Sequence, residues 1–216
     1  MSLTGPAVPA ASGKTDSLVI LCHGYGADGN DLIGLAPFWQ SMLPDTAFIA
    51  PNAPERCEMG GFGYQWFGID ARGAQDMSAG MLRAAPVLDA FIDAQLALHG
   101  LDESRLALVG FSQGTIMSLH VGLRRKLAPA VIIGFSGALI GAELLREISC
   151  RPPVLLIHGD ADPVLPVEHM HQAEAALSAA GLAVQWHVSP GVGHGIDEAG
   201  ITLAGRFLQE ALYSTN

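Results

Sequence analysis

Short apolar runs alternate with longer stretches of helical periodicity from Asp16 onward. Most of the runs are continuously apolar and rich in leucine and β-branched residues, which is typical of strands buried on both faces of a parallel sheet. The pattern predicts strands at residues 17–22, 46–50, 105–110, 130–136, 153–158 and 183–189. It predicts helices at residues 30–42, 76–98, 113–126, 166–180 and 196–213. Pro86 lies inside the second helical pattern, so that helix should kink or begin near it.

Strands and helices that alternate in this way predict an α/β protein with a mostly parallel central sheet and helices on both faces. The sequence has no internal repeat, low-complexity tract or obvious interdomain linker. We therefore expect a loose lead-in over residues 1–15 and a single domain over residues 16–216. Residues 51–74 are rich in Gly, Pro and aromatic residues without periodicity, and a loop of that length is usually functional.

Composition and charge restrict the class of protein and its partners. Half of the 216 residues are hydrophobic, yet the longest apolar runs are far shorter than the ~20 residues that a membrane span needs. The net charge is −10, and the one basic cluster, Arg124–Lys126, fits a helix end that complements the helix dipole. Nucleic acids and anionic membranes need clustered Lys and Arg, so we expect neither a nucleic-acid partner nor stable membrane association.

The cysteines point to a reducing environment. Cys22, Cys57 and Cys150 are odd in number and scattered, unlike a disulfide framework or a metal-binding pattern. The first residues lack the basic-then-apolar layout of a signal peptide. We therefore expect a cytoplasmic protein.

A candidate nucleophile lies in Gly110–Gly114, which matches G-x-S-x-G around Ser112. The pentapeptide alone is a weak signal, but an apolar run leads into it and a helical pattern follows. That context predicts the strand–tight turn–helix of a nucleophile elbow, in which glycines relieve crowding and the serine hydroxyl projects above the sheet at a helix N-terminus. The alternative is an ordinary serine N-cap.

A serine hydroxyl needs a base to accept its proton, and His194 is the strongest candidate. It lies in the glycine-rich loop 190–195, between the last predicted strand and the last predicted helix. Loops at strand ends are where α/β sheets hold their sites. His23 and His158 each end a strand in a His-Gly pair and are rivals, although such a histidine commonly bonds only to nearby backbone.

The base in turn needs a carboxylate that holds its tautomer, and we assign Asp162, which follows a predicted strand and precedes a proline. Asp160 is the rival, with turn formation as its alternative role. The order Ser112, Asp162, His194 is the chain order of α/β-hydrolases.

The loop Gly24–Gly29 follows the first predicted strand and could bring backbone N–H groups to a reacting carbonyl. We expect an oxyanion hole formed by the N–H groups of Gln113 and Tyr25. The same glycines also match the dinucleotide fingerprint G-x-G-x-x-G, but the preceding His23 and the charge of Asp28 argue against a pyrophosphate there.

Taken together, these motifs resemble the phospholipase/carboxylesterase family, which includes the acyl-protein thioesterases. The matching stretches are residues 21–32, 51–54, 110–114, 158–166 and 193–195, and the resemblance extends from about residue 17 to 212. It implies an α/β-hydrolase fold with Ser112 as nucleophile, Asp162 as acid and His194 as base. It also puts Tyr25 and Gln113 at the oxyanion positions, with no metal or organic cofactor.

The resemblance implies action on carboxylic esters with modest acyl chains and, in some members, on thioesters or lysophospholipids. Residues 57–70 fit the bacterial carboxylesterase-like members better than the eukaryotic thioesterases. Trp66, Phe67 and Leu165 are candidates for contact with the acyl group, although a Trp-Phe pair is often simple packing.

Only 16 residues separate Ser136 from Pro153, where secreted lipases commonly carry large lids, so we expect no large lid domain. A lidless site suits small-molecule or single-chain lipid esters. We therefore predict a serine carboxylesterase, with a homodimer compatible with the family. The alternatives are a non-catalytic hydrolase-like binding protein, and a peptidase or dienelactone-type hydrolase on the same scaffold. A serine rather than a cysteine at position 112 argues against the dienelactone type.

Overall fold

The computed structural model describes residues 3–58, 60, 62–69 and 74–213. The strands are β1 (Ala7–Val8), β2 (Ser17–Cys22), β3 (Thr46–Ile49), β4 (Glu55–Arg56), β5 (Tyr64–Gln65), β6 (Leu106–Phe111), β7 (Val131–Phe135), β8 (Val154–Gly159) and β9 (Val184–Ser189). Seven of them form one sheet in the order β1-β3-β2-β6-β7-β8-β9, and β4 pairs with β5 in a separate antiparallel sheet. Within the large sheet all neighbours are parallel except β1, which is antiparallel to β3.

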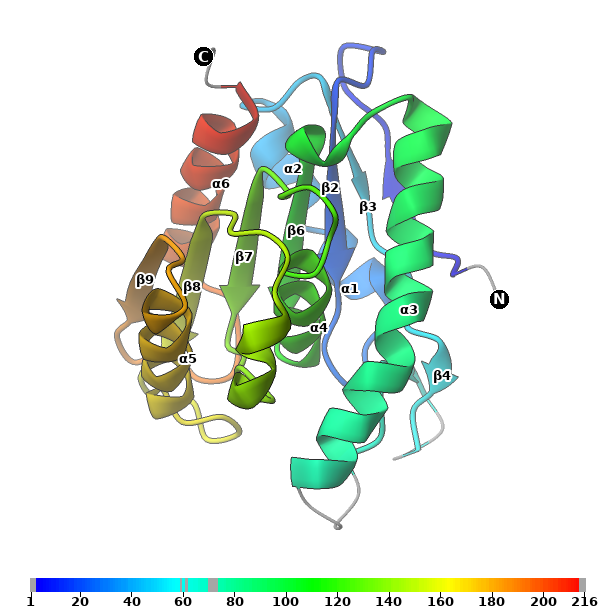
Figure 1. Ribbon diagram of the computed structural model, residues 1–216. Helices are drawn as coiled ribbons and strands as arrows, with labels where there is room; N and C mark the ends of the chain where they lie inside the picture. The colour runs from blue at the N-terminus through cyan, green and yellow to red at the C-terminus, as the bar shows by residue number, and fades with distance from the viewer. Residues whose placement is uncertain (1–2, 59, 61, 70–73, 214–216) are drawn as a thin grey trace.

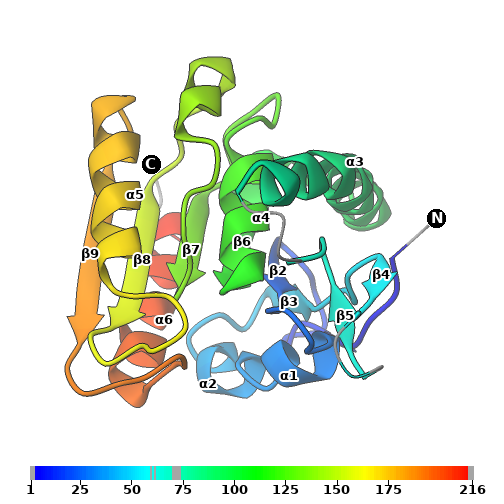
Figure 2. The same ribbon diagram turned by 90° about the horizontal axis from the view of Figure 1, so that it is seen from below.

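Helices cover both faces of the large sheet (Figures 1 and 2). They are α1 (Gly29–Ile33), α2 (Ala36–Gln40), α3 (Ala74–His99), α4 (Gln113–Gly122), α5 (Glu168–Ala179) and α6 (Glu198–Tyr213), with short 3-10 helices η1 (Glu103–Arg105) and η2 (Ala142–Glu147). Figure 2 shows α3, α4 and α5 on one face and α1, α2 and α6 on the other. The predicted α/β fold is therefore confirmed.

Strand β2 shows why the apolar runs are continuous. Its residues Leu18, Ile20 and Cys22 pack into the core beneath α3, α4 and α5, whereas Val19 and Leu21 pack into the core on the α6 side. All five side chains have no exposed surface. Because successive residues of a strand point to opposite faces, a strand with two covered faces has no polar position to alternate with.

The N-terminal segment differs from the expected loose lead-in. Strand β1 pairs with β3, and the N–H groups of Ala50 and Asn52 donate to the carbonyls of Pro6 and Thr4. A two-residue strand is too short to produce a periodic signal, so the sequence pattern could not reveal it. Residues 1–2 lie outside the described part of the chain.

One helical prediction also needs correction. The pattern over 30–42 forms two short helices, α1 and α2, with Pro37 in the first turn of α2, where a proline needs no hydrogen-bond partner. Helix α3 does not begin at Pro86 but runs through it, and Figure 1 shows the helix changing direction along its length, which agrees with the first of the two predicted outcomes, a kink. No helix of the described residues, α3 included, has the length and apolar character needed to cross a bilayer.

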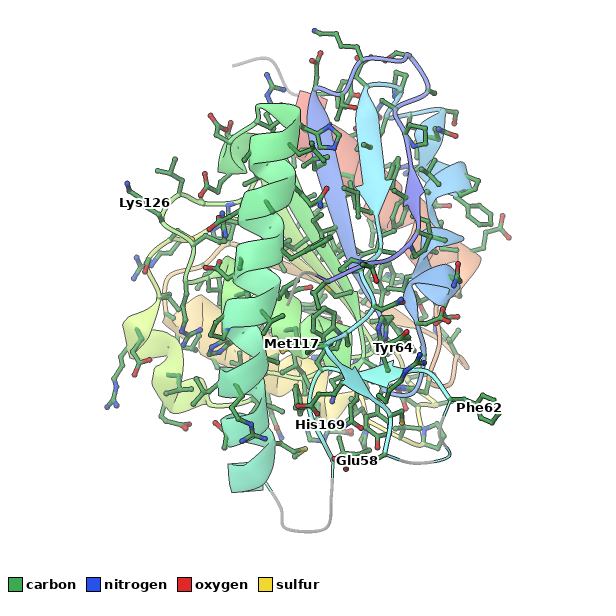
Figure 3. The ribbon with its side chains drawn as sticks, turned by 90° about the vertical axis from the view of Figure 1, so that its right-hand side faces the viewer. Glu58, Phe62, Tyr64, Met117, Lys126 and His169 are labelled. Carbon is green, nitrogen blue, oxygen red and sulfur yellow. The ribbon has the colours of Figure 1, made fainter. Side chains whose placement is uncertain are left out.

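The predicted 51–74 loop contains the hairpin of β4 and β5, with Arg56 placed 4.4 Å above the ring centre of Tyr64. Positions 59, 61 and 70–73 of this loop lie outside the described residues. Figure 3 shows Phe62 projecting from the hairpin, whereas Tyr64 lies against the body of the protein.

Two residues of the basic cluster, Arg124 and Arg125, bond within the fold rather than forming an exposed basic patch. Arg124 donates to the carbonyl of His120 near the end of α4, as expected for a cation at a helix C-terminus. Arg125 is nearly fully buried and lies 2.6 Å from a carboxylate oxygen of Asp89 and of Asp93 in α3, and 3.2 Å from one of Glu103. It therefore ties α3 to the chain that follows α4.

Substituting Arg125→Met should lower the free energy of unfolding by about 2 kcal/mol, because three carboxylates lose their buried cationic partner while the methionine preserves most of the packing. Urea denaturation followed by circular dichroism measures this difference. Lys126→Met is the matched control, since Lys126 is exposed and its loss should change stability by less than about 0.5 kcal/mol. Equal stability of the two variants would contradict the structural role of Arg125.

His120 makes stability depend on pH. Burial, reinforced by nearby Arg124, lowers the pKa of this histidine in α4 to about 4. The unfolded chain takes up this proton near pH 6.5, so the folded state loses stability as the pH falls from about 6.5 towards 4. From pH 7.5 to 4.5 the wild type should lose about 2 kcal/mol more than a His120→Gln variant in urea denaturation. The same loss in both proteins would show that His120 does not carry the effect.

Candidate active site

Ser112 lies at the sharp turn between β6 and α4. Its φ angle of 53° is unusual for a residue with a side chain, and it occupies the N-cap position of α4. A Cβ atom at Gly114 would overlap the carbonyl oxygen of Cys22, and one at Gly110 would overlap the backbone of Gly114. Only glycine permits such close passage of β6, α4 and β2. The predicted strand–turn–helix is therefore present.

Three side chains that are far apart in the sequence form one hydrogen-bonded line. Oγ of Ser112 lies 3.0 Å from Nε2 of His194, and Nδ1 of His194 lies 2.7 Å from Oδ2 of Asp162. Because the carboxylate accepts from Nδ1, the proton of the neutral imidazole resides there and Nε2 is left to accept from the serine. The ring of Phe111 supports the imidazole at a centroid distance of 5.0 Å.

The Asp162 side chain is fully buried, and several hydrogen-bond donors surround its carboxylate. Its Oδ1 accepts the backbone N–H groups of Val164 and Leu165 at 2.8 and 2.9 Å. Burial alone would raise the pKa of Asp162, but the hydrogen bonds from His194, Leu165 and Val164 together outweigh burial and hold that pKa below its usual value. The carboxylate is thus anionic where it faces the imidazole.

The rival residues bond elsewhere. Asp160 accepts the N–H of Gly191 and so stabilises a turn. Nδ1 of His23 donates to the carbonyl of Gly24, and its Nε2 accepts from the N–H of Ala53, which leaves neither ring nitrogen for a substrate.

His158 also bonds to backbone rather than to a serine. Its Nε2 donates to the carbonyl of Leu165 at 2.7 Å and lies 3.2 Å from Oδ2 of Asp162. It therefore supports the turn that carries the acid.

The loop after β2 and the start of α4 meet beside Ser112. Tyr25 and Gln113, the two predicted oxyanion residues, both line the same pocket as the serine. Gln113 is the first residue of α4, where backbone N–H groups have no acceptor within the helix. The hairpin fixes the loop, because Gly26 donates to the carbonyl of Tyr64 and Tyr64 donates to that of Ala27.

A pocket of about 400 Å³ opens at Ser112 and His194. That volume is within the range of small-molecule sites, about 300–1,000 Å³. Phe67 and Leu165, two of the three residues predicted to contact the acyl group, line this pocket, and the contact itself stays a prediction. None of its lining residues in the described chain is an aspartate, glutamate, lysine or arginine.

Trp66 does not line this pocket, and its expected acyl contact needs correction. The indole is fully buried, and its Nε1 donates to the carbonyl of His23. Trp66 thus braces the loop after β2, while its neighbour Phe67 faces the pocket.

Several pocket residues were not anticipated from the sequence: Ile69, Met77, Phe111, Ile116 and Val164. Ile116 had a usable signal, since it lies four residues after Ser112 and therefore on the same face of α4. Ile69 and Val164 are 44% and 63% exposed, so they form an apolar rim. Met77 had no local signal.

The segment between Ser136 and Pro153, where secreted lipases commonly carry a lid, forms no lid over the pocket. Residues 136–153 are all described, and the single helix among them is the six-residue η2. Among the described residues, no three His, Cys, Asp or Glu side chains cluster in a way that could hold a metal ion.

Comparison with known proteins agrees with this geometry. A family model described as Phospholipase/Carboxylesterase matches residues 3–212. The crystal structure of esterase PE8 has 46% sequence identity and a TM-score of 0.95, over 98% of this chain and 100% of that one. A probable carboxylesterase of Oryza sativa is 31% identical over 88% of this chain and 75% of its own length. Acyl-protein thioesterase 1 of Gibberella zeae is 28% identical, over 86% of each chain.

Proposed function

Since the chain belongs to the phospholipase/carboxylesterase family and is a serine hydrolase of carboxylesterase type, we propose that it hydrolyses short- to medium-chain carboxylic esters through Ser112, His194 and Asp162. The observation that carries this proposal is the line from Ser112 Oγ through His194 to Asp162 at the mouth of an uncharged pocket of about 400 Å³. An uncharged lining supports a neutral acyl group as the ligand.

In the proposed reaction, Oγ of Ser112 attacks the acyl carbonyl while Nε2 of His194 takes the hydroxyl proton. The anionic Asp162 stabilises the imidazolium that forms. The carbonyl oxygen becomes an oxyanion that accepts hydrogen bonds from the N–H groups of Gln113 and Tyr25. His194 then gives its proton to the leaving alcohol, and the acyl group remains on the serine.

The second half of the reaction repeats these steps with water. His194 removes a proton from the water, whose oxygen attacks the acyl-serine, and the proton returns to Oγ as the carboxylic acid leaves. All groups required for both halves belong to this chain. The apolar rim of Ile69 and Val164 suits an ester whose acyl part is apolar.

A substrate panel tests the proposed specificity. p-Nitrophenyl esters of increasing acyl length should be hydrolysed, with the highest kcat/KM for short or medium chains, and a lysophospholipid and an acyl-thioester are measured beside them. Hydrolysis confined to long-chain lipids would contradict the proposed substrate class.

With no lid, triolein hydrolysis should show no marked activation at an oil–water interface.

Covalent labelling separates an enzyme from a hydrolase-like binding protein. A fluorophosphonate probe should label the wild type and leave Ser112→Ala unlabelled. A protein that binds an ester but takes up no probe would instead support the binding role.

A further inference from the structure

The side chain of Gln113 bonds to a neighbouring loop rather than to the triad. Its Oε1 accepts the backbone N–H of Trp66 at 2.8 Å, and its Nε2 donates to the carbonyl of Phe67 at 2.7 Å. Gln113 is only 4% exposed. Strand β5 ends at Gln65, so the carboxamide provides one donor and one acceptor to the chain just beyond that strand, as a neighbouring peptide group would.

This contact lies directly behind the pocket wall. Phe67 lines the pocket and is 1% exposed, and Ile69 continues the same wall. On the far side, helix α3 approaches so closely that a Cβ atom at Gly80 would lie 2.6 Å from Cβ of Phe67. The wall is thus held between Gly80 and the carboxamide of Gln113, and a buried N–H or C=O that loses its partner is costly.

We propose that the side chain of Gln113 is a positioning residue that fixes the Phe67 wall and thereby determines which acyl chains the pocket accepts. The inference rests on the proposed esterase function. The backbone N–H of Gln113 is the proposed oxyanion donor, so one residue joins the reacting carbonyl to the wall that the acyl chain contacts.

The test compares two buried glutamines of the same region. Gln113→Met keeps a side chain of similar length and removes both hydrogen bonds. Gln65→Met is the matched control: Gln65 is 1% exposed and also makes two hydrogen bonds, to the N–H of Glu58 and to the carboxylate of Glu55, but it does not line the pocket. Both variants loosen the same loop, and only one releases the wall.

We measure kcat/KM for p-nitrophenyl acetate and for the ester with the longest acyl chain that the wild type hydrolyses. In Gln113→Met the long-chain value should fall at least about tenfold relative to acetate, because acetate contacts the wall least. In Gln65→Met the ratio of kcat/KM for the long-chain ester to kcat/KM for acetate should stay within about twofold of the wild-type ratio. An unchanged ratio in Gln113→Met, or an equal change in Gln65→Met, overturns the inference.

Further variants keep the test decisive. If Gln113→Met does not fold, Gln113→Asn keeps a carboxamide but shortens the side chain by one methylene group, so it cannot reach both Trp66 and Phe67. The same fall in long-chain kcat/KM relative to acetate is expected. Combined with Phe67→Leu, the substitution at Gln113 should act on the ratio non-additively, because both change one wall; additive effects overturn the inference. A wild type that hydrolyses no ester at all would refute the proposed function instead.

Discussion

Replacing Ser112 with alanine should lower kcat for p-nitrophenyl butyrate by at least about 10⁴-fold. The methyl group cannot attack the carbonyl, and His194, 3.0 Å from the lost oxygen, has no proton to accept. The pocket and the proposed oxyanion donors remain in this variant and would still bind the ester, so KM should change far less than kcat. Steady-state kinetics with active-site titration of the wild type measures the effect.

Ser118→Ala is the control for this substitution. Ser118 lies in the same helix and is buried, but it does not line the pocket, so kcat should stay within about twofold of the wild type. If Ser112→Ala kept most of the wild-type activity, Ser112 could not be the nucleophile.

Asp162→Asn should lower kcat by about 10⁴-fold. Oδ1 of Asp162 accepts two backbone N–H groups, so the oxygen of the replacing amide must stay there and its NH₂ group must face His194. A donor at that position forces the proton of the imidazole onto Nε2, which can then no longer accept from Ser112. The measurement is kcat with the butyrate ester, together with the rate of fluorophosphonate labelling, which should fall in parallel.

Asp160→Asn is the matched control for the acid. Asp160 is exposed and accepts one N–H, from Gly191, a role that an amide oxygen can also fill. The kcat of Asp160→Asn should stay within about twofold of the wild-type value. The opposite ranking, with Asp160→Asn inactive and Asp162→Asn active, would show that the acid had been assigned to the wrong carboxylate.

The fold was largely predictable because parallel strands that are buried on both faces have uninterrupted apolar sequences. The large strands lie within a residue or two of their predicted positions, and the family predicted from the motifs is confirmed. Strand β1 could not be predicted, because its two residues are held by pairing with β3 and not by any pattern of their own.

The candidate site was predictable where chemistry restricts the residue type. The Ser, Asp and His positions follow from strand ends and turn residues, and their catalytic roles remain predictions until the variants are measured. The pocket wall was not predictable to the same degree. Trp66 and Phe67 are adjacent aromatics, and only the position of the chain after β5 decides which of them faces the pocket.

The proposed triad spans four of the seven strands of the large sheet, from β6 to β9, so esterase activity reports on the assembly of that part of the sheet. Ser112 follows β6, Asp162 follows β8 and His194 follows β9, and the serine and the histidine are 82 positions apart in the sequence. Parallel strands of such sequence separation pair slowly, because a long loop must close before each pair forms. On refolding from urea, helical signal should therefore return before esterase activity, which needs every strand from β6 to β9 in register.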